Sequence, residues 1–170
     1  MPVSVNVMPR YVRLARKLAA DRNRSFEEND TWDNDVKTYG VEAEKRNFRG
    51  LMGEFAFAEY ADLTVDTAVY DMTDGGVDFT VEYEGDRCTF DTKTAQSKPY
   101  AIFVKEGCVS ANYYIQGHLD NRTVKFLGMA TREEVLSTEL SETPYDHRNH
   151  EIPVEELDAV PTPEALKSVG

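Results

Sequence analysis

Apolar residues recur at helical spacing in the first part of the chain. Residues 8–21 and residues 41–62 each carry one apolar stripe and are predicted to form helices. Residues 22–40 are polar and predict a loop or a weakly helical connector. The two stripes consist of Tyr11, Leu14, Ala15 and Leu18 in the first helix, and of Phe48, Leu51, Met52, Phe55 and Ala58 in the second.

From Leu63 onward the period changes to two, which is typical of strands. Thr131 and Glu134 have the spacing of a capping box and predict a short helix through Leu136. Residues 141–151 are expected to form a loop, and residues 164–169 a last turn of helix. The predicted strands are LTVDTAVY from residue 63, VDFTVEY from residue 77, RCTFDTK from residue 87, AIFVK, NYYIQGHL and TVKFLGMA.

Helices, then strands, then short helices indicate an α+β fold, or a mixed α/β fold, with a central, antiparallel-rich mixed sheet flanked by helices. The length of 170 residues suits one domain. We expect residues 1–40 to hold a basic helix and the connector. Residues 41–136 would form the core, and residues 137–170 a loop and a short helix.

The composition argues against a membrane protein and against secretion. No apolar run approaches the roughly 18 residues that a membrane span needs. The first residues contain no apolar stretch of the kind found in secretory signals. Cys88 and Cys108 each lie next to apolar or strand-forming residues, so we expect two buried thiols and no disulfide. These features predict a cytoplasmic protein.

The net charge of −12 is unevenly distributed. Residues 1–24 hold six basic side chains and one acidic side chain, whereas the remainder holds 13 basic and 30 acidic. This excess of acidic residues has three possible interpretations: adaptation to molar salt, an acidic mimic of DNA, or a protein unrelated to nucleic acid. We favour a halophilic protein in a high-salt cytoplasm, because a Debye length of about 3 Å in molar salt removes general repulsion from DNA.

Among the charged side chains of the two predicted strands over residues 78–93, Asp78, Asp91 and Lys93 are the candidates for chemistry. A two-residue turn at residues 85–86 would pair Asp78 with Lys93, whereas a turn at residues 84–85 would pair Asp78 with Asp91. Either register places Asp78, Asp91 and Lys93 on one face, because side chains alternate along a strand.

Two neighbouring carboxylates and an ammonium group have a specific chemical use. Paired carboxylates bind Mg²⁺, which takes oxygen ligands and keeps several waters. A lysine beside them could hold or help to deprotonate an attacking water. The alternative is a solvated strand face with ordinary cross-strand ion pairs.

Glu54 is a third candidate carboxylate. It lies on the shoulder of the apolar stripe of the second helix, with Gly50, Gly53 and Ala61 leaving room beside it. A carboxylate that leans toward a sheet is costly unless it is paired or bound to a metal. Glu59, on the opposite shoulder, is the rival candidate.

Three segments, RGLMGEFAFAEY, GGVDF and TFDTK, together resemble the PD-(D/E)-x-K nuclease superfamily, which has the restriction-endonuclease-like fold. The resemblance covers residues 47–96, with a supportive order of elements to residue 136. It implies that Glu54, Asp78 and Asp91 bind Mg²⁺, with Mn²⁺ as a possible substitute. It also implies that the Thr92 carbonyl joins these ligands and that Lys93 is the catalytic lysine.

The sequence departs from the family pattern at several positions. Val77 stands where the family has proline, and Pro99 disfavours the helix that usually follows the third strand. Residues 96–100 fit a Q-x-x-x-Y motif that we attribute to chance, although Gln96 is a candidate for the border of the site. A second D-x-K at residues 35–37 lacks a strand pattern and is set aside.

Other polar residues give weaker signals. His147 and His150 form an H-x-x-H pair with no third ligand nearby, so we expect surface histidines. His118 is expected to be structural, and Trp32 to anchor the connector. In the first helix, Arg10, Arg13 and Lys17 could contact a phosphate backbone or could simply be solvated.

The sequence therefore predicts a Mg²⁺-dependent DNA nuclease, most simply an endonuclease that leaves a 5′-phosphate as the family does. Its DNA partner could be bound by a homodimer, since a duplex has two strands. The alternatives are a non-catalytic DNA- or protein-binding module on the same fold, or an acidic DNA mimic. A mimic would gain nothing from a basic first helix.

Overall fold

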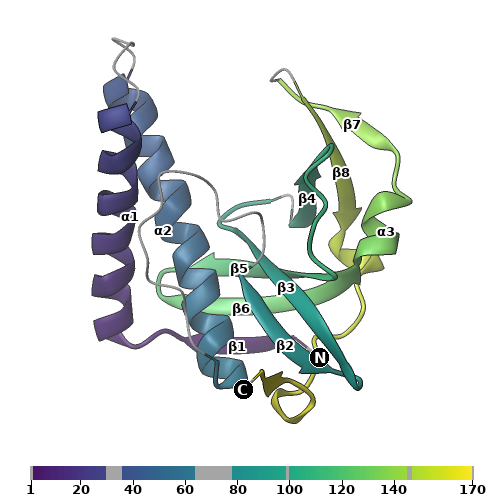
Figure 1. The fold of residues 1–170 in the computed structure, drawn as a ribbon. Helices are drawn as coiled ribbons and strands as arrows, with labels where there is room; N and C mark the ends of the chain where they lie inside the picture. Colours follow the sequence, from purple (N-terminus) through teal and green to yellow (C-terminus); the bar gives the residue numbers. More distant parts are fainter. Residues whose placement is uncertain (1, 30–35, 64–77, 99, 145–146, 170) are drawn as a thin grey trace.

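The computed structural model describes residues 2–29, 36–63, 78–98, 100–144 and 147–169. Two long helices, α1 (Pro9–Asn29) and α2 (Val36–Ala61), lie side by side (Figure 1). Residues 22–40 were predicted to form a loop or a weakly helical connector, and the loop alternative was wrong for residues 22–29 and 36–40, which belong to the two helices. Residues 22–29 and 36–39 contain neither proline nor glycine, and most of them are compatible with a helix, so both helices extend into the predicted connector.

A six-stranded sheet lies against the helices, in the order β1-β6-β5-β3-β2-β9 (Figure 1). Only β3 and β5 are parallel; the other neighbours are antiparallel. The predicted mixed, antiparallel-rich sheet is confirmed at this level. Its strands are β1 (Val3–Asn6), β2 (Phe79–Tyr83), β3 (Asp86–Ala95), β5 (Tyr113–Asp120), β6 (Thr123–Thr131) and β9 (Lys167–Ser168).

A second, three-stranded sheet has the order β4-β8-β7. It consists of β4 (Ala101–Lys105), β7 (Leu140–Glu142) and β8 (Arg148–Pro153). The prediction of a loop over residues 141–151 was therefore wrong at both ends. Strand β8 is stabilised by pairing with the distant β4, and β7 pairs in turn with β8. Local periodicity does not report the pairing with a distant segment.

The remaining short elements complete the C-terminal part. Helix α3 (Arg132–Leu136) begins at the predicted cap, where Thr131 Oγ1 accepts a hydrogen bond from Glu134 N at 3.1 Å. Two 3₁₀ turns follow, η1 (Val154–Glu156) and η2 (Pro163–Ala165). The last predicted helical turn is reduced to η2 and is followed by β9. Residues 137–170 thus contribute strands to both sheets.

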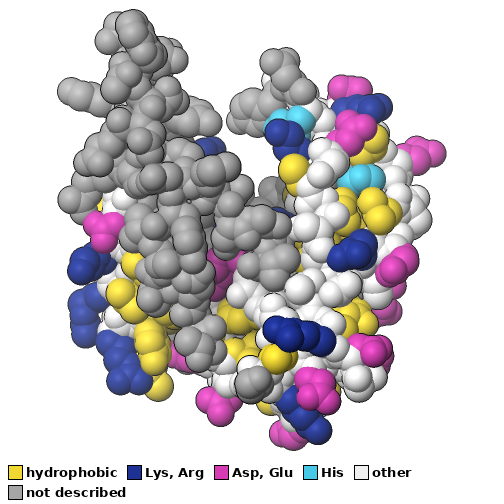
Figure 2. Space-filling model, viewed as in Figure 1, with side chains coloured by type: hydrophobic (Ala, Val, Ile, Leu, Met, Phe, Trp, Pro, Cys, Tyr) yellow, Lys and Arg dark blue, Asp and Glu magenta, His cyan; other side chains and the backbone are white. Residues whose placement is uncertain are grey.

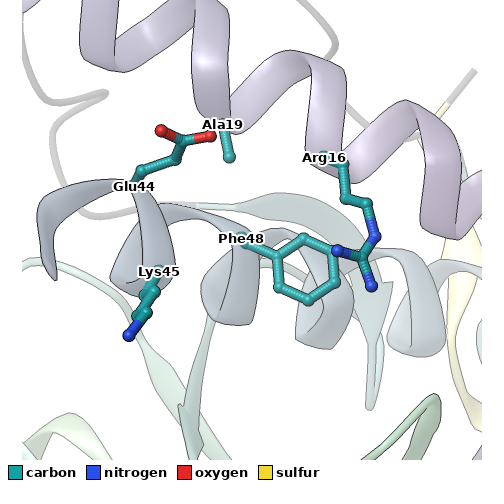
Figure 3. A pocket seen from close by; sticks show the side chains of 5 residues that line it. All are labelled: Arg16, Ala19, Glu44, Lys45 and Phe48. Carbon is teal, nitrogen blue, oxygen red and sulfur yellow. The ribbon is translucent and has the colours of Figure 1, made fainter. Parts of the chain in front are cut away.

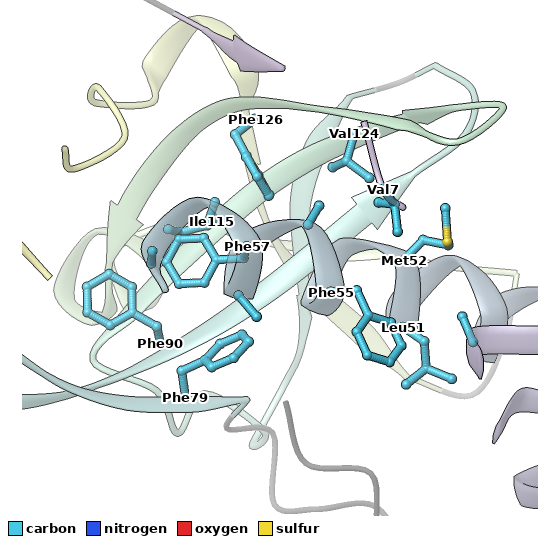
Figure 4. Close-up of a cluster of buried hydrophobic side chains, with 14 of the residues drawn as sticks. Val7, Leu51, Met52, Phe55, Phe57, Phe79, Phe90, Ile115, Val124 and Phe126 are labelled. Atoms are coloured by element: carbon cyan, nitrogen blue, oxygen red, sulfur yellow. The ribbon is translucent and has the colours of Figure 1, made fainter. Parts of the chain in front are cut away.

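Two apolar clusters cover the two faces of the large sheet. On one face, Phe57 of α2 packs against Phe79, Phe90 and Phe126, with ring centroids 5.2–6.1 Å apart (Figure 4). On the other face, Tyr114 belongs to a cluster with residues of the small sheet. The long helices therefore cover one face. On the other face the short helix α3 contributes Val135 to the cluster, so that side is covered by the small sheet with one short helix and not by a layer of helices, which corrects the expectation of a sheet flanked by helices.

Several predictions can be compared directly with the structure. All five residues of the second predicted stripe are buried or half-buried, which confirms that stripe. Cys88 is buried as expected, but Cys108 is exposed because it follows a turn outside the strands. The predicted strand from residue 63 and the proposed anchor Trp32 lie almost entirely outside the described residues.

None of the described helices combines the length and apolar composition that a membrane span requires.

Candidate active site

The hairpin that carries the three charges turns at Glu84 and Gly85. Both residues have positive φ values, 54° and 84°, as a two-residue type I′ turn requires. Strand β2 pairs with β3 so that Phe79 lies opposite Phe90, which places Asp78 opposite Asp91. The register that pairs Asp78 with Lys93 was wrong, and the alternative register is the one found.

Asp78 lies where β3 loses its partner strand. Strand β3 pairs with β2 only as far as Phe90, whereas its pairing with β5 continues to Ala95. Asp78 Oδ2 accepts hydrogen bonds from Thr92 N at 2.7 Å and from Thr92 Oγ1 at 2.8 Å. The Asp78 carboxyl group therefore replaces the missing strand at this edge and is held firmly beside Asp91.

Asp91 and Lys93 form an ion pair within this arrangement. Lys93 Nζ lies 2.8 Å from Asp91 Oδ2, and Asp91 is only 4% exposed. Burial and the adjacent Asp78 carboxyl group raise the pKa of Asp91 from 3.8 to about 8, although Lys93 opposes the rise. At neutral pH the two carboxyl groups together hold an additional proton.

The Lys93 ammonium group remains charged at neutral pH. Burial lowers the pKa of Lys93, but the carboxylates of Asp91 and Asp78 more than offset this, and the pKa lies above its ordinary value. Lys93 Nζ also lies 5.9 Å from the centroid of the Tyr114 ring. Lys93 is thus suited to donate hydrogen bonds and to stabilise negative charge, and it is poorly suited to remove a proton.

Helix α2 packs on one face of β3, and Asp91 and Lys93 lie on the other face. Gly53 meets Thr94 so closely that a Cβ at Gly53 would lie 1.9 Å from Thr94 Oγ1. Phe90 and Thr94 face α2, so Asp91 and Lys93, at alternating positions, face away from it. Glu54 follows Gly53 on the helix and is half-buried. In the described part of the chain, no three His, Cys, Asp or Glu side chains are close enough to hold a metal ion.

The structure therefore brings together Asp78, Asp91 and Lys93, but it does not bring Glu54 into a group of three carboxylates. The rival residue, Glu59, accepts a hydrogen bond from Met8 N at 3.5 Å and so lies near the junction of β1 and α1. Thr92 contributes its amide and hydroxyl groups to Asp78. Gln96 is exposed in a bend after β3, and no helix carries the Q-x-x-x-Y residues that the structure describes.

The histidines behave as structural residues. His150 is buried, and its Nδ1 lies 3.2 Å from Thr138 Oγ1, so the expectation of a surface histidine was wrong for this residue. His150 alternates inward on β8, whose pairing the sequence did not reveal. His118 packs against Tyr100 with ring centroids 4.4 Å apart and the rings tilted by 36°.

Sequence reasoning missed Gln116 and Tyr114 on β5. Tyr114 lies opposite Asp91 and Gln116 lies opposite Lys93 in the parallel pairing of β3 and β5. The signal in the sequence was a polar residue in the middle of an otherwise apolar strand, YYIQGHL. Its meaning depended on knowing which strand lies next to β3.

Basic side chains gather on the helical pair. Figure 2 shows Lys and Arg side chains along the outer side of the two helices near the start of α1. Arg10, Arg13 and Lys17 are exposed there. Between the helices, a pocket of about 360 Å³ is lined by Arg16, Ala19, Glu44, Lys45 and Phe48 (Figure 3). The Arg16 guanidinium lies over the Phe48 ring, 5.0 Å from its centroid.

Comparisons with known proteins add no relative. The chain matches no family model, no curated protein and no solved structure.

Proposed function

We propose that this protein is a Mg²⁺-dependent DNA nuclease, an endonuclease, whose active site contains Asp78, Asp91 and Lys93. The observation that carries the proposal is the carboxyl pair of buried Asp91 and half-buried Asp78 at the free edge of β3, with an ammonium group 2.8 Å from an oxygen of Asp91. Such a pair must hold either a proton or a cation, because two bare carboxylates at this spacing repel each other in a poorly solvated place.

The donor set fits a hard divalent cation. Asp78 and Asp91 offer carboxylate oxygens from adjacent strand positions, and Mg²⁺ favours oxygen ligands with water completing its shell. The resemblance to PD-(D/E)-x-K nucleases adds Glu54 and the Thr92 carbonyl as further candidate ligands. Bound Mg²⁺ would neutralise phosphate charge and lower the pKa of a coordinated water.

Lys93 would orient the attacking water and stabilise charge on the phosphate. The raised pKa of Lys93 keeps the side chain as an ammonium group, which donates hydrogen bonds. In the reaction, the water oxygen bonds to phosphorus while the bond from phosphorus to the 3′ oxygen breaks. One proton of the attacking water would pass to solvent, and the departing 3′ oxygen would take one from solvent, so the products are a 5′-phosphate and a 3′-hydroxyl.

The exposed basic residues of α1 would hold the DNA backbone. Arg10, Arg13 and Lys17 repeat at helical spacing, and each phosphate contact of this kind is independent of base sequence. Gln96, exposed at the end of β3, would border the cleaved strand. Two copies of the chain would present one site to each strand of a duplex.

A second candidate is a binding module without catalysis. The specific observation that favours it is the Asp91–Lys93 ion pair, which compensates both charges without a metal. Such a module would retain DNA or protein binding when Asp91 is replaced.

Cleavage of supercoiled plasmid in high KCl separates the two candidates. The parent would be compared with Asp91→Asn, Lys93→Ala and the matched control Lys125→Ala, which removes an exposed lysine from β6. We expect nicking or linear product with Mg²⁺ or Mn²⁺, none with EDTA, and loss in the two site variants only. If the folded parent cleaves neither plasmid nor single-stranded nor branched DNA, the proposal that the protein is a nuclease is rejected.

A further inference from the structure

Gln116 is a buried polar residue beside the proposed active site. It lies on β5, opposite Lys93 of β3, and is 1% exposed. Paired residues of neighbouring parallel strands project from the same face of the sheet. The position of Lys93 Nζ near the Tyr114 ring, two residues before Gln116, confirms that Lys93 lies along this face of β5.

The Gln116 amide has a fixed orientation. Its Nε2 donates a hydrogen bond to Gly117 O at 2.9 Å, and a carbonyl oxygen can only accept, so Oε1 must be the other atom. Oε1 is buried and accepts no hydrogen bond from any group that the structure describes. The register between β5 and β6 shifts between Gln116 and Gly117, which marks a local irregularity of the kind that re-aims a side chain.

An acceptor and an unused donor therefore occur on neighbouring strands. Lys93 has three N–H donors, and its ammonium group forms an ion pair with Asp91, which leaves donors available. A water that accepts from Lys93 Nζ and donates to Gln116 Oε1 would satisfy both groups and keep a lone pair free. Buried polar atoms commonly bind such waters.

We propose that Gln116 is a positioning residue, which holds the attacking water between its Oε1 and the Lys93 ammonium group. This inference rests on the proposed nuclease function, since it assigns the nucleophile of that reaction. A misplaced nucleophile typically costs about a hundredfold in rate. Replacement of Gln116 should therefore slow the chemical step and leave DNA and metal binding in place.

The test compares Gln116→Met, which keeps the length but removes the acceptor, with Gln116→Glu, which retains an acceptor oxygen. The matched control is Thr94→Val, because Thr94 Oγ1 is equally buried and unpartnered but faces α2. In single-turnover cleavage we expect a loss of about tenfold to a hundredfold for Gln116→Met, a smaller loss for Gln116→Glu and none for Thr94→Val.

Three further measurements decide the role of Gln116. The Kd values for DNA and for Mg²⁺, by titration, should stay within about twofold of the parent in Gln116→Met. The Tm of Gln116→Met should stay close to that of the parent, because the fold loses only the hydrogen bond from Nε2 to Gly117 O and one to the bound water. A tenfold loss of Mg²⁺ affinity would overturn the inference and make Gln116 a metal ligand. A large fall in Tm would also overturn it and make Gln116 a structural residue.

A crystal structure of the parent tests the inference without activity. We expect one ordered water within hydrogen-bonding distance of both Gln116 Oε1 and Lys93 Nζ. Its absence at a resolution that shows other buried waters would overturn the assignment, even if the parent cleaves DNA. If that water is present and the folded parent cleaves nothing, the proposed function fails and the water site stands.

Discussion

Asp91 is a carboxyl group that the fold has moved out of water and placed beside a second carboxyl group. Its sequence neighbours give no sign of this, because Thr92 and Lys93 are common partners of a solvated aspartate. The difference arises from the edge of β3, where Asp78 binds the Thr92 amide at 2.7 Å. Two predictions follow from this environment at the scale of single residues.

The first prediction concerns stability and pH in the absence of metal. Because burial and Asp78 raise the pKa of Asp91 from 3.8 to about 8, the folded state binds a proton that the unfolded state has lost. The resulting stabilisation is complete below pH 3.8 and is lost as the pH rises to about 8. Asp91→Asn, which cannot ionise, should therefore gain stability relative to the parent between pH 5 and pH 8.5.

Denaturant unfolding at the two pH values measures this effect. We expect the free-energy difference between variant and parent to change by at least about 1.4 kcal/mol, the equivalent of one pKa unit. Glu142→Gln, at an exposed site on β7, serves as the control and should show no such change. Equal pH dependence in Asp91→Asn and the parent would contradict the raised pKa.

The second prediction concerns the exchange of a proton for a metal. If Mg²⁺ binds the carboxyl pair, it must displace the proton that the pair holds at pH 7, so binding should release about one proton. At pH 9.5 the proton has already been lost, and release should fall toward zero. Calorimetric titration in two buffers of different ionisation enthalpy counts the protons. Binding without proton release at pH 7 would place the metal elsewhere.

At the scale of elements, the contact between α2 and β3 sets the depth at which the helix lies on the sheet. Gly53 lets the helix approach Thr94, and Phe57, one turn later, packs against Phe90. Gly50 lies one turn before Gly53, and a Cβ there would meet nothing within 4 Å. The two glycines of one helix thus have opposite roles.

Substitution of these glycines should change stability in opposite directions. Gly53→Ala forces a Cβ against Thr94 Oγ1 and should cost about 1–3 kcal/mol of unfolding free energy. Gly50→Ala should add about 0.5–1 kcal/mol, because alanine is the better helix former and has room. Denaturant unfolding of both variants tests this. The double variant Gly53→Ala with Thr94→Ala should recover most of the loss, and no recovery would assign it to another contact.

At the scale of the whole molecule, a net charge of −12 makes the chain repel itself in dilute buffer. Salt weakens this repulsion, since the Debye length falls from about 10 Å at 0.1 M to about 3 Å at 1 M. At such salt concentrations the general repulsion between an acidic protein and DNA is also removed.

We therefore expect the Tm to rise by several degrees between 0.1 M and 2 M KCl. Choline chloride, which screens charge with a different cation, should reproduce most of the rise up to about 0.5 M. A Tm that stays constant or falls over this range would contradict the salt-adapted reading.

The sequence by itself determined the elements whose signals are local. The apolar stripe of α2, the cap at Thr131 and the two faces of the hairpin follow from periods of 3.6 and 2 within one segment. These periods also sufficed to place Asp78, Asp91 and Lys93 together. The choice between two turns for the hairpin was left open, because both turns keep the same faces.

Only the tertiary structure decided which segments lie next to one another. The parallel pairing of β3 with β5, which places Gln116 beside Lys93, joins strands separated by β4 in the chain. The pairing of β8 with β4 buries His150. Strand β2 begins only at Phe79, which leaves beyond Phe90 the free edge of β3 that Asp78 occupies. Burial, the pKa of Asp91 and the unpartnered oxygen of Gln116 all depend on such non-local neighbours, which a pattern read along one segment does not contain.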